Sequence, residues 1–582
     1  MADGTNPGID VRIKSTVLPA EQIDNMRRLV VEKSWSAADR AELEFRDDDL
    51  ETTYRVGDPI EIKMAAHHET TLVQVFAGDI VGIGLRYTDG IGYVTIEALD
   101  ARHKLTRTIE PKTYENVKLD DIVRNIAGAH GLSVEGSLGN TVFEHFIVAD
   151  SHFAVLQYAA RRSGTVWTLT DSKLKFSDPG TADGSTAELE AGTDLIDIDL
   201  RFAPIEQAKE VAVNGWDQSQ GKAIVGKVTS TKPIHEIGFP KNTVSEDTAV
   251  AWGGGAHDVK DAQEVATGIE RRLRSADVIG TGSAELRPDL VPGRKVKLKN
   301  IGTLFNGDYV LSSVVHRFGD LDGTGSTDFR VGPPDASLDQ LLGDGERQGG
   351  RAPNGITIGT VTDTDDPKKL GRVRVKLPLI SDQLQTGWVR TSSLGSGKDR
   401  GIVFVPEIND EVVVAFEHGE LNRPYVLGGL WNDVGTAFEG ATKGNQTDER
   451  RLVSKLGSAV RFIDVGSDDE TSGIAIEMDD AKTRIFMGYK QVTIETEGRP
   501  LEIKNGKASI KMENDDITIT ANNITVDAKQ KLDVKSTMDT TIKAGQNATI
   551  EATAQLNAKS NAGTTVESSA ITAVKGSMVQ VN

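Results

Sequence analysis

The C-terminal part of the chain carries apolar or small residues at every eighth position. The central track of this repeat consists of Val526, Val534, Ile542, Ile550, Ala558, Val566 and Val574. A second track lies two residues earlier, from Ile524 to Thr572, and a third track of small residues lies two residues later. Because side chains two apart in a strand share a face, each repeat predicts a five-residue strand followed by a three-residue corner.

This repeat predicts a trimer. An octad is too short to close one turn of a single-chain β-helix, and the small third track cannot fill a wide core. Three chains wound together would form a narrow triangular prism, and about eleven octads, seven regular and four looser, would make a needle of roughly 50 Å at about 4.8 Å each. Less regular copies run upstream through Ile494, Ile503, Ile510 and Ile519. The predicted needle core comprises Ile524, Val526, Leu532, Val534, Ile542, Ile550, Leu556, Val566 and Val574.

Composition alone would also allow a disordered tail rich in Thr, Ala, Lys and Asp. Disorder does not keep three tracks in phase over seven repeats, so the pattern favours the needle. Residues 490–582 hold 11 Lys or Arg and 11 Asp or Glu, so this segment is neutral.

Residues 353–435 have the pattern of a compact all-β domain. An alternating strand follows the turn at Asp366-Pro367, and a breaker, Pro378, ends it. Further strands are expected at Trp388–Thr391, Gly401–Val405, Glu411–Glu417 and Pro424–Leu430. Five short strands in about 80 residues are typical of a small Greek-key barrel such as the OB-fold.

The first 335 residues alternate strands with helices. One helix is expected over Leu119–His130, with Leu119, Ile122, Val123 and Ile126 on one apolar face. A second begins after Ser151 as N-cap and ends at Gly164, and a third lies near Asp261–Arg274. Strands are expected over Thr71–Leu85 and Gly92–Ala98.

The motifs of the middle domain make the interpretation specific. They are GRVRVKLP at 371–378, GWVR at 387–390, PEINDEV at 406–412, FEHG at 416–419 and RPYVLG at 423–428. In this order they closely resemble the OB domain of the VgrG spike family, found in type VI secretion systems, contractile phage tails and extracellular contractile injection systems. The first half is similar to the hub of that family and to the phage late control D family, through the helix before Gly164, Gly215-Trp216-Asp217 and the run from Asn306 to His316.

The resemblance implies a mainly β fold with a few helices. Its domains would be a hub of two tube-like barrels with inserted helical parts (1–335), a linker (336–352), an OB-fold collar (353–435), connecting β-strands (436–489) and the needle (490–582). Three chains would present six barrels to a six-fold tube. The family's function is structural, since the trimer joins the inner tube and baseplate to a needle that punctures a membrane on contraction.

The resemblance also names partners. The hub would bind inner tube and baseplate proteins, a PAAR-type protein would cap the needle, and effectors are possible cargo. A three-fold needle end exposes unpaired strand edges, which explains why a cap is expected there. The residues expected to hold it are Met578, Val579, Val581 and Asn582.

Charge disfavours nucleic acid as a partner. The formal net charge is -21 at pH 7, and all of it lies upstream of the neutral needle. OB-folds that bind nucleic acid need stacking aromatics in a basic groove, which this acidic domain does not offer. The start of the chain lacks a signal peptide and no stretch of about 18 apolar residues occurs, so we expect synthesis in the cytoplasm and assembly in a phage tail-like particle.

Enzyme signatures are weak, so no catalytic residue, cofactor or metal is expected. The chain has no Cys. Residues 393–399 resemble half of a phosphate loop, but Asp399 replaces the Ser or Thr that would hold magnesium. Gly343-Asp344-Gly345 lacks a third Gly, and His67-His68 lacks a third ligand at metal spacing. The runs Asp47-Asp48-Asp49 and Asp468-Asp469-Glu470 are typical of solvated turns.

Two other functions are compatible with a repetitive C-terminal segment. A tailspike or tail-associated glycan or peptidoglycan hydrolase would need aromatic residues along the helix, and no Trp or Phe follows Phe486. A trimeric adhesin fibre would carry a globular head after the stalk, where this sequence ends. Both are disfavoured relative to the spike.

Overall fold

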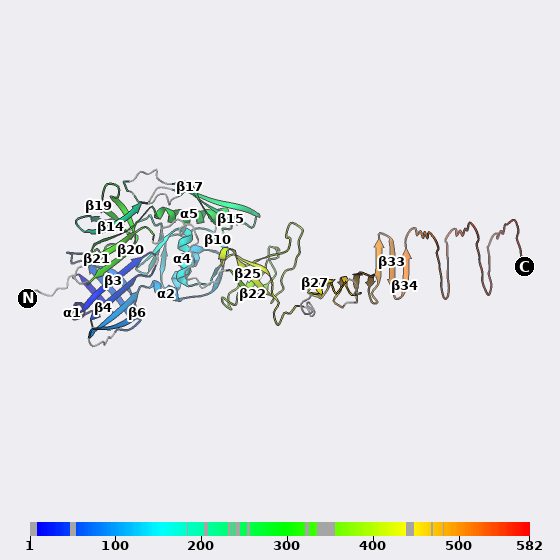
Figure 1. Cartoon of the computed structure of the whole chain (residues 1–582), viewed down its shortest axis with the longest axis horizontal. Coiled ribbons are helices and arrows are strands. Elements are labelled where there is room, and N and C mark those ends of the chain that lie inside the picture. Colours follow the sequence, from blue (N-terminus) through cyan, green and yellow to red (C-terminus); the bar gives the residue numbers. More distant parts are fainter. Residues whose placement is uncertain are drawn as a thin grey trace, which may run out of the picture. The chain divides into compact units, whose positions relative to one another are not determined.

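The computed structural model is mainly β, as the sequence predicts, and forms two compact units, residues 1–437 and 438–582 (Figure 1). It describes residues 8–35, 37–46, 54–182, 184, 186–202, 208–230, 234–235, 237–238, 245–252, 256–319, 325–333, 355–437, 447–466, 470–480 and 482–581. The expected linker, 336–352, and the Gly343-Asp344-Gly345 and Asp47-Asp48-Asp49 motifs lie outside these residues.

One 13-stranded sheet organises the part that we call the hub, residues 8–333. Its first half holds β1 (Ile9–Ile13), β2 (Thr16–Val17), β3 (Met26–Ser34), β4 (Arg40–Arg46), β5 (Pro59–Ala65), β6 (Leu72–Thr88) and β7 (Ile91–Leu99), with the short α1 (Ala20–Asp24). Its second half holds β13 (Ala187–Glu190), β14 (Leu195–Phe202), β18 (Val278–Glu285), β19 (Lys295–Lys299), β20 (Gly307–Phe318) and β21 (Ser326–Val331).

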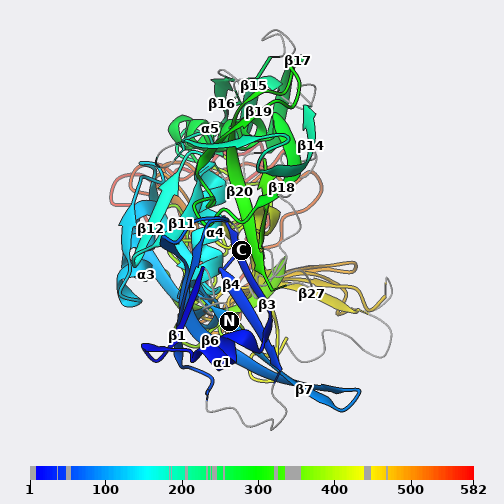
Figure 2. The same ribbon diagram turned by 90° about the vertical axis from the view of Figure 1, so that its left-hand side faces the viewer.

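Strand β20 joins the two halves, because it pairs with β21 and β19 on the second half and with β3 on the first. Figure 2 shows β3 and β20 side by side. Each half has a separate hydrophobic core, with Leu29, Leu43 and Ile96 in the first and Leu311 and Phe329 in the second. The hub is thus one continuous sheet around two cores.

In the sequence, a first helical insert lies between the two halves of the sheet, after β7 and before β13. It comprises α2 (Arg102–Arg107), β8 (Lys112–Lys118), α3 (Leu119–Ala129), β9 (Ser133–Glu135), β10 (Val142–Val148), α4 (His152–Ser163), β11 (Val166–Thr170) and β12 (Lys173–Ser177). The predicted caps of α4 are confirmed: Ser151 accepts a hydrogen bond from the Ala154 N–H, and Gly164 is left-handed with φ of 64°.

A second insert packs against the first. Strands β16 (Lys222–Thr229), β15 (Ala208–Asp217) and β17 (Ser245–Trp252) form a sheet in this order, and α5 (Val259–Ser275) covers one face of it. A Cβ on Gly164 would lie 2.2 Å from the Gly268 carbonyl oxygen, so only glycine allows α4 and α5 to approach this closely.

The collar, residues 355–437, is a five-stranded sheet in the order β23-β22-β25-β26-β24. The strands are β22 (Ile356–Asp363), β23 (Arg374–Lys376), β24 (Arg390–Thr391), β25 (Glu411–Phe416) and β26 (Pro424–Gly429). The strand expected over Gly401–Val405 is wrong, because this segment is irregular and exposed. In the described residues, its apolar segment has no neighbouring strand with which to form a ladder.

The second unit begins with a meander of β27 (Glu449–Val453), β28 (Ala459–Ile463), β29 (Gly473–Glu477), β30 (Arg484–Gly488) and β31 (Val492–Glu495). A three-stranded sheet follows, β32 (Leu501–Asn505), β33 (Ala508–Glu513) and β34 (Asp516–Thr520). The sheet of connecting strands therefore continues beyond residue 489. From 521 to 581 the described backbone contains no strand, and the octads form open loops in Figure 1.

Candidate assembly surfaces

The octad tracks present a long apolar surface in the single chain. All nine predicted core side chains are exposed, from Ile524 at 57% to Ile542 at 81%, so one chain does not bring them together. A five-residue strand satisfies its backbone N–H and C=O groups only beside another strand, and the chain supplies none after β34 in its described part. Contiguous apolar surface of this extent marks an interaction site.

The end of this segment is similarly open. Met578, Val579 and Val581 are exposed, whereas Asn582 lies outside the described residues. A role of these side chains in holding a cap stays a prediction.

The collar carries a second apolar surface, which the sequence analysis missed. Ile402, Val403, Phe404 and Val405 are all exposed, with Val403 at 85%. In the described chain, the backbone of these four residues is held by a hydrogen bond from the Ile402 N–H to the Leu394 carbonyl and by one from Ser393 Oγ to the Ile402 carbonyl. Four consecutive apolar residues were the signal in the sequence, which predicts a strand there.

The hub and the collar share one core. Ile147 and Ala149, at the end of β10, pack with the collar residues Val373, Val389 and Val426. Polar contacts reinforce this packing: the Ile147 N–H donates to Asn422 Oδ1, and Thr113 Oγ1 donates to the Gln385 carbonyl. The junction is therefore a packed interface, not a flexible tether.

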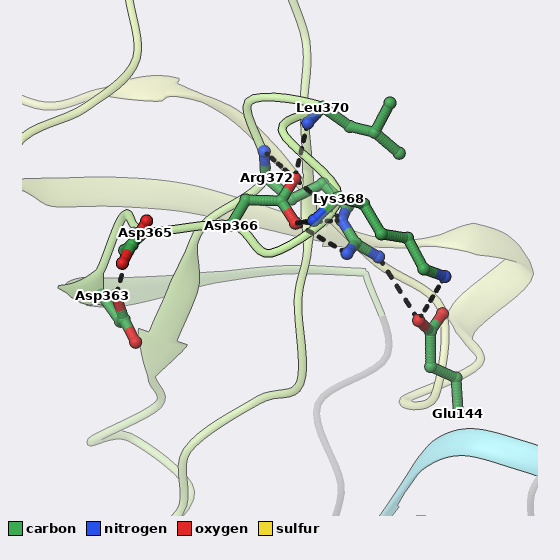
Figure 3. Close-up of polar contacts among 7 residues, drawn as sticks. All are labelled: Glu144, Asp363, Asp365, Asp366, Lys368, Leu370 and Arg372. Atoms are coloured by element: carbon green, nitrogen blue, oxygen red, sulfur yellow. Dashed lines mark hydrogen bonds and ion pairs between the residues drawn. The ribbon is translucent and has the colours of Figure 1, made fainter.

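A loop of the collar is tied to the hub by charges (Figure 3). Asp366, which is 5% exposed, accepts from Arg372 Nη2 at 2.7 Å and from the backbone N–H groups of Lys368 and Leu370. The hydrogen bond from Arg372 holds the pKa of Asp366 well below its usual range. Lys368 Nζ and Arg372 Nη1 also reach Glu144 of β10, at 2.8 and 3.5 Å.

Further contacts extend this junction. Arg374 forms an ion pair with Glu115 of β8 at 2.8 Å. The ring of His145 lies against Gly387, where a Cβ would come within 2.7 Å of the ring, and burial lowers the pKa of His145. The GWVR motif thus begins with glycine because the hub ring occupies the space of a side chain.

The weak enzyme motifs are not assembled into sites. Residues 393–399 form an exposed loop, from which Ser393 Oγ donates to the Ile402 carbonyl, and the described residues 400–410 that follow it contain no helix to receive a phosphate. His67 and His68 lie on a turn, with their rings tilted by 52° and the ring centroids 3.8 Å apart. Glu470 pairs with Lys490 at 3.2 Å, while Asp468 and Asp469 lie outside the described residues.

Within the part of the chain that the structure describes, no group of three or more His, Cys, Asp or Glu side chains could hold a metal ion. Among the same residues, no helix is long and apolar enough to cross a membrane.

Comparison with known families agrees with the collar fold. Residues 357–431 match the family described as the type VI secretion system/phage-baseplate injector OB domain. This match defines the collar as an OB domain of the type found in contractile injectors. Residues 30–320, half of the chain, match the family described as the Alg8 N-terminal domain. The chain belongs to the Alg8 N-terminal domain family, and its collar is similar to the OB domain of VgrG-type spike proteins.

Individual relatives are distant. The type VI secretion system spike proteins VgrG1c and VgrG1a of Pseudomonas aeruginosa are each 29% identical to this chain over 91 residues, which is 16% of this chain. The matched segment spans only 12% and 14% of those relatives.

Two solved structures are also similar. The E. coli c3393 protein, described as a type VI secretion component resembling the T4 tail proteins gp27 and gp5, is 14% identical, with a TM-score of 0.45. The similarity covers 72% of this chain and 99% of that one. A half-lidded Francisella PdpA–VgrG complex is 10% identical over 88% of both chains, also with a TM-score of 0.45.

Proposed function

We propose that the chain is the fused hub and central spike of a contractile injection machine and works as a homotrimer. The observation that carries this proposal is the row of exposed apolar side chains from Ile524 to Val574, downstream of a collar that matches the injector OB domain. Three chains give each track partners: inward side chains meet at the axis, and each strand finds neighbours on both sides.

Stiffness is the activity that this architecture supplies. In the proposed needle, unfolding of one chain must disrupt two others, which makes the rod kinetically stable. The packed junction between hub and collar, with Ile147 in the collar core and Arg372 bridging to Glu144, supports transmission of an axial force. No chemical step is needed for this role, and we propose no catalytic residue.

The partners follow from the two ends. The hub would dock on inner tube and baseplate proteins, and the exposed Met578, Val579 and Val581 would receive a small PAAR-type cap. Effector cargo would travel with the spike, nucleic acid would not bind, and a target membrane would be met only on contraction. Assembly would take place in a phage tail-like particle after synthesis in the cytoplasm.

Native mass spectrometry of the full chain tests the proposal. The expected species has three times the 62.6 kDa of one chain and persists on dilution. A stable monomer at micromolar concentration would contradict the proposed function. Pull-down with a PAAR-type protein then tests the cap separately, since a trimer that binds no such protein keeps the spike and loses the proposed tip.

A further inference from the structure

The charged residues of the last octads all occupy the same position of the repeat. Between residues 540 and 581 only five residues are charged, and each directly follows a residue of the central apolar track. Their signs alternate from Lys543 onward, whereas Lys535, one octad upstream on the same line, is a cation like Lys543. The five residues are Lys543, Glu551, Lys559, Glu567 and Lys575.

These charges are unpaired in one chain. All five side chains are exposed, and no ion pair joins any of them to another described residue. By contrast, two upstream lysines pair locally, Lys529 with Asp527 and Lys531 with Asp533, each at 2.8 Å. From Glu551 onward, no opposite charge lies closer in sequence than eight residues.

The proposed trimer brings residues eight apart together. Side chains one position after the inward track point outward from the prism. In a three-fold winding, each successive octad of one chain lies on the next face of the prism and one strand spacing further along the axis. The strand directly beside it on that face is the preceding octad of another chain, about 4.8 Å away. Lys543 of one chain then lies beside Glu551 of the next.

We propose that these five residues form interchain ladders of ion pairs that fix the stagger of the three chains at one octad. The inference rests on the proposed trimer, and its partner is a second copy of this chain. Strands stacked in register would place Lys on Lys and Glu on Glu, and a stagger of two octads would do the same, because the sign repeats every 16 residues. The apolar tracks are nearly uniform and cannot distinguish these registers, whereas the charges can.

Single exposed ion pairs contribute little, but each contact in this ladder occurs three times per trimer and neighbouring contacts share charges. The ladder therefore acts as a network. Registers that place like charges together are disfavoured, and the network therefore selects the stagger of one octad.

Two full-length variants test the ladder. The first, E551K with K559E, keeps the composition and net charge but places two cations together at positions 543 and 551 and two anions together at positions 559 and 567. The second inverts the whole line with K543E, E551K, K559E, E567K and K575E, which retains the alternation. We would measure trimer dissociation by native mass spectrometry and the thermal midpoint at about 0.01 M salt, where charges interact over about 30 Å, and at about 1 M, where the range is about 3 Å.

The exchanged variant should dissociate about tenfold faster than the parent at low salt and approach it at high salt. The inverted variant should remain as stable as the parent. The ladder is refuted if the exchanged variant matches the parent at low salt, or if the inverted variant is weakened equally. A parent chain that is monomeric would instead contradict the proposed function, so the two failures are distinguishable.

Discussion

At the scale of single residues, His316 shows what burial does to a titrating group. It lies in β20 between β3 and β21, is fully buried, and bonds Thr327 Oγ1 through Nδ1 at 3.0 Å. Burial, assisted by the nearby Lys33, lowers the pKa of His316 to about 3. The ring is therefore neutral in the folded hub throughout the physiological range.

This burial makes hub stability depend on pH. The unfolded chain binds a proton at His316 near pH 6.5 and the folded chain does not, so stability is present above that pH and falls as the pH drops towards 3. Between pH 6.5 and 5 the loss should be about 2 kcal/mol. Urea unfolding of the full chain and of His316→Gln checks this, since the Gln variant should lose stability less steeply. Parallel pH profiles would contradict it.

At the scale of elements, the junction between collar and hub contains one buried ion pair and one peripheral ion pair. Arg372 has an 8% exposed side chain and neutralises Asp366, whereas the ammonium group of Lys368, on a 59% exposed side chain, pairs with Glu144. Removal of Arg372 leaves a buried carboxylate without its cation, and removal of Lys368 leaves a partly solvated one.

Arg372→Ala should therefore destabilise the collar by about 3 kcal/mol, and Lys368→Ala by less than about 1 kcal/mol. Chemical denaturation gives the free energies, and limited proteolysis between hub and collar reports the docking. Equal effects of the two substitutions would show that the buried pair has no special role.

The elements also show how far the sequence predicts the fold. The ends of α3 and α4 were predictable because caps and apolar faces are local signals, as at Ser151 and Gly164. The mainly β fold and the VgrG-type family are confirmed, since the collar motifs are specific and closely spaced. The ladder between β3 and β20 and the contact of Arg372 with Glu144 were not predictable, because 228 or more residues separate the partners of those contacts.

The error at Gly401–Val405 and the missing strands after Thr520 have a common cause. Both segments have strand-like sequences but lack a neighbouring strand in the described part of one chain. A pattern of apolar residues indicates which side chains become buried. It does not indicate whether the same chain or another copy buries them.

At the scale of the whole molecule, assembly should depend on one face of the octads. Ile542 belongs to the central track, whereas Thr541, between the second track and the central one, points to the outer face of the predicted strand. An aspartate at the axis would place three carboxylates together without solvent, whereas one on the outer line stays hydrated.

Ile542→Asp should abolish the trimer at micromolar concentration, and Thr541→Asp should leave it intact. Sedimentation velocity of the two full-length variants distinguishes these states. Trimers of equal stability in both would contradict the inward assignment of the central track.

The pairing of β20 with β3 has a consequence for synthesis. Val31 leaves the ribosome about 285 residues before His316, its partner in the ladder. At about 5–20 residues per second, the edge of β3 waits roughly 15 to 60 seconds for the strand that covers it. During that interval a nascent hub presents an unpaired strand edge that can pair with other chains, so its yield should depend on chaperones that bind such edges during translation.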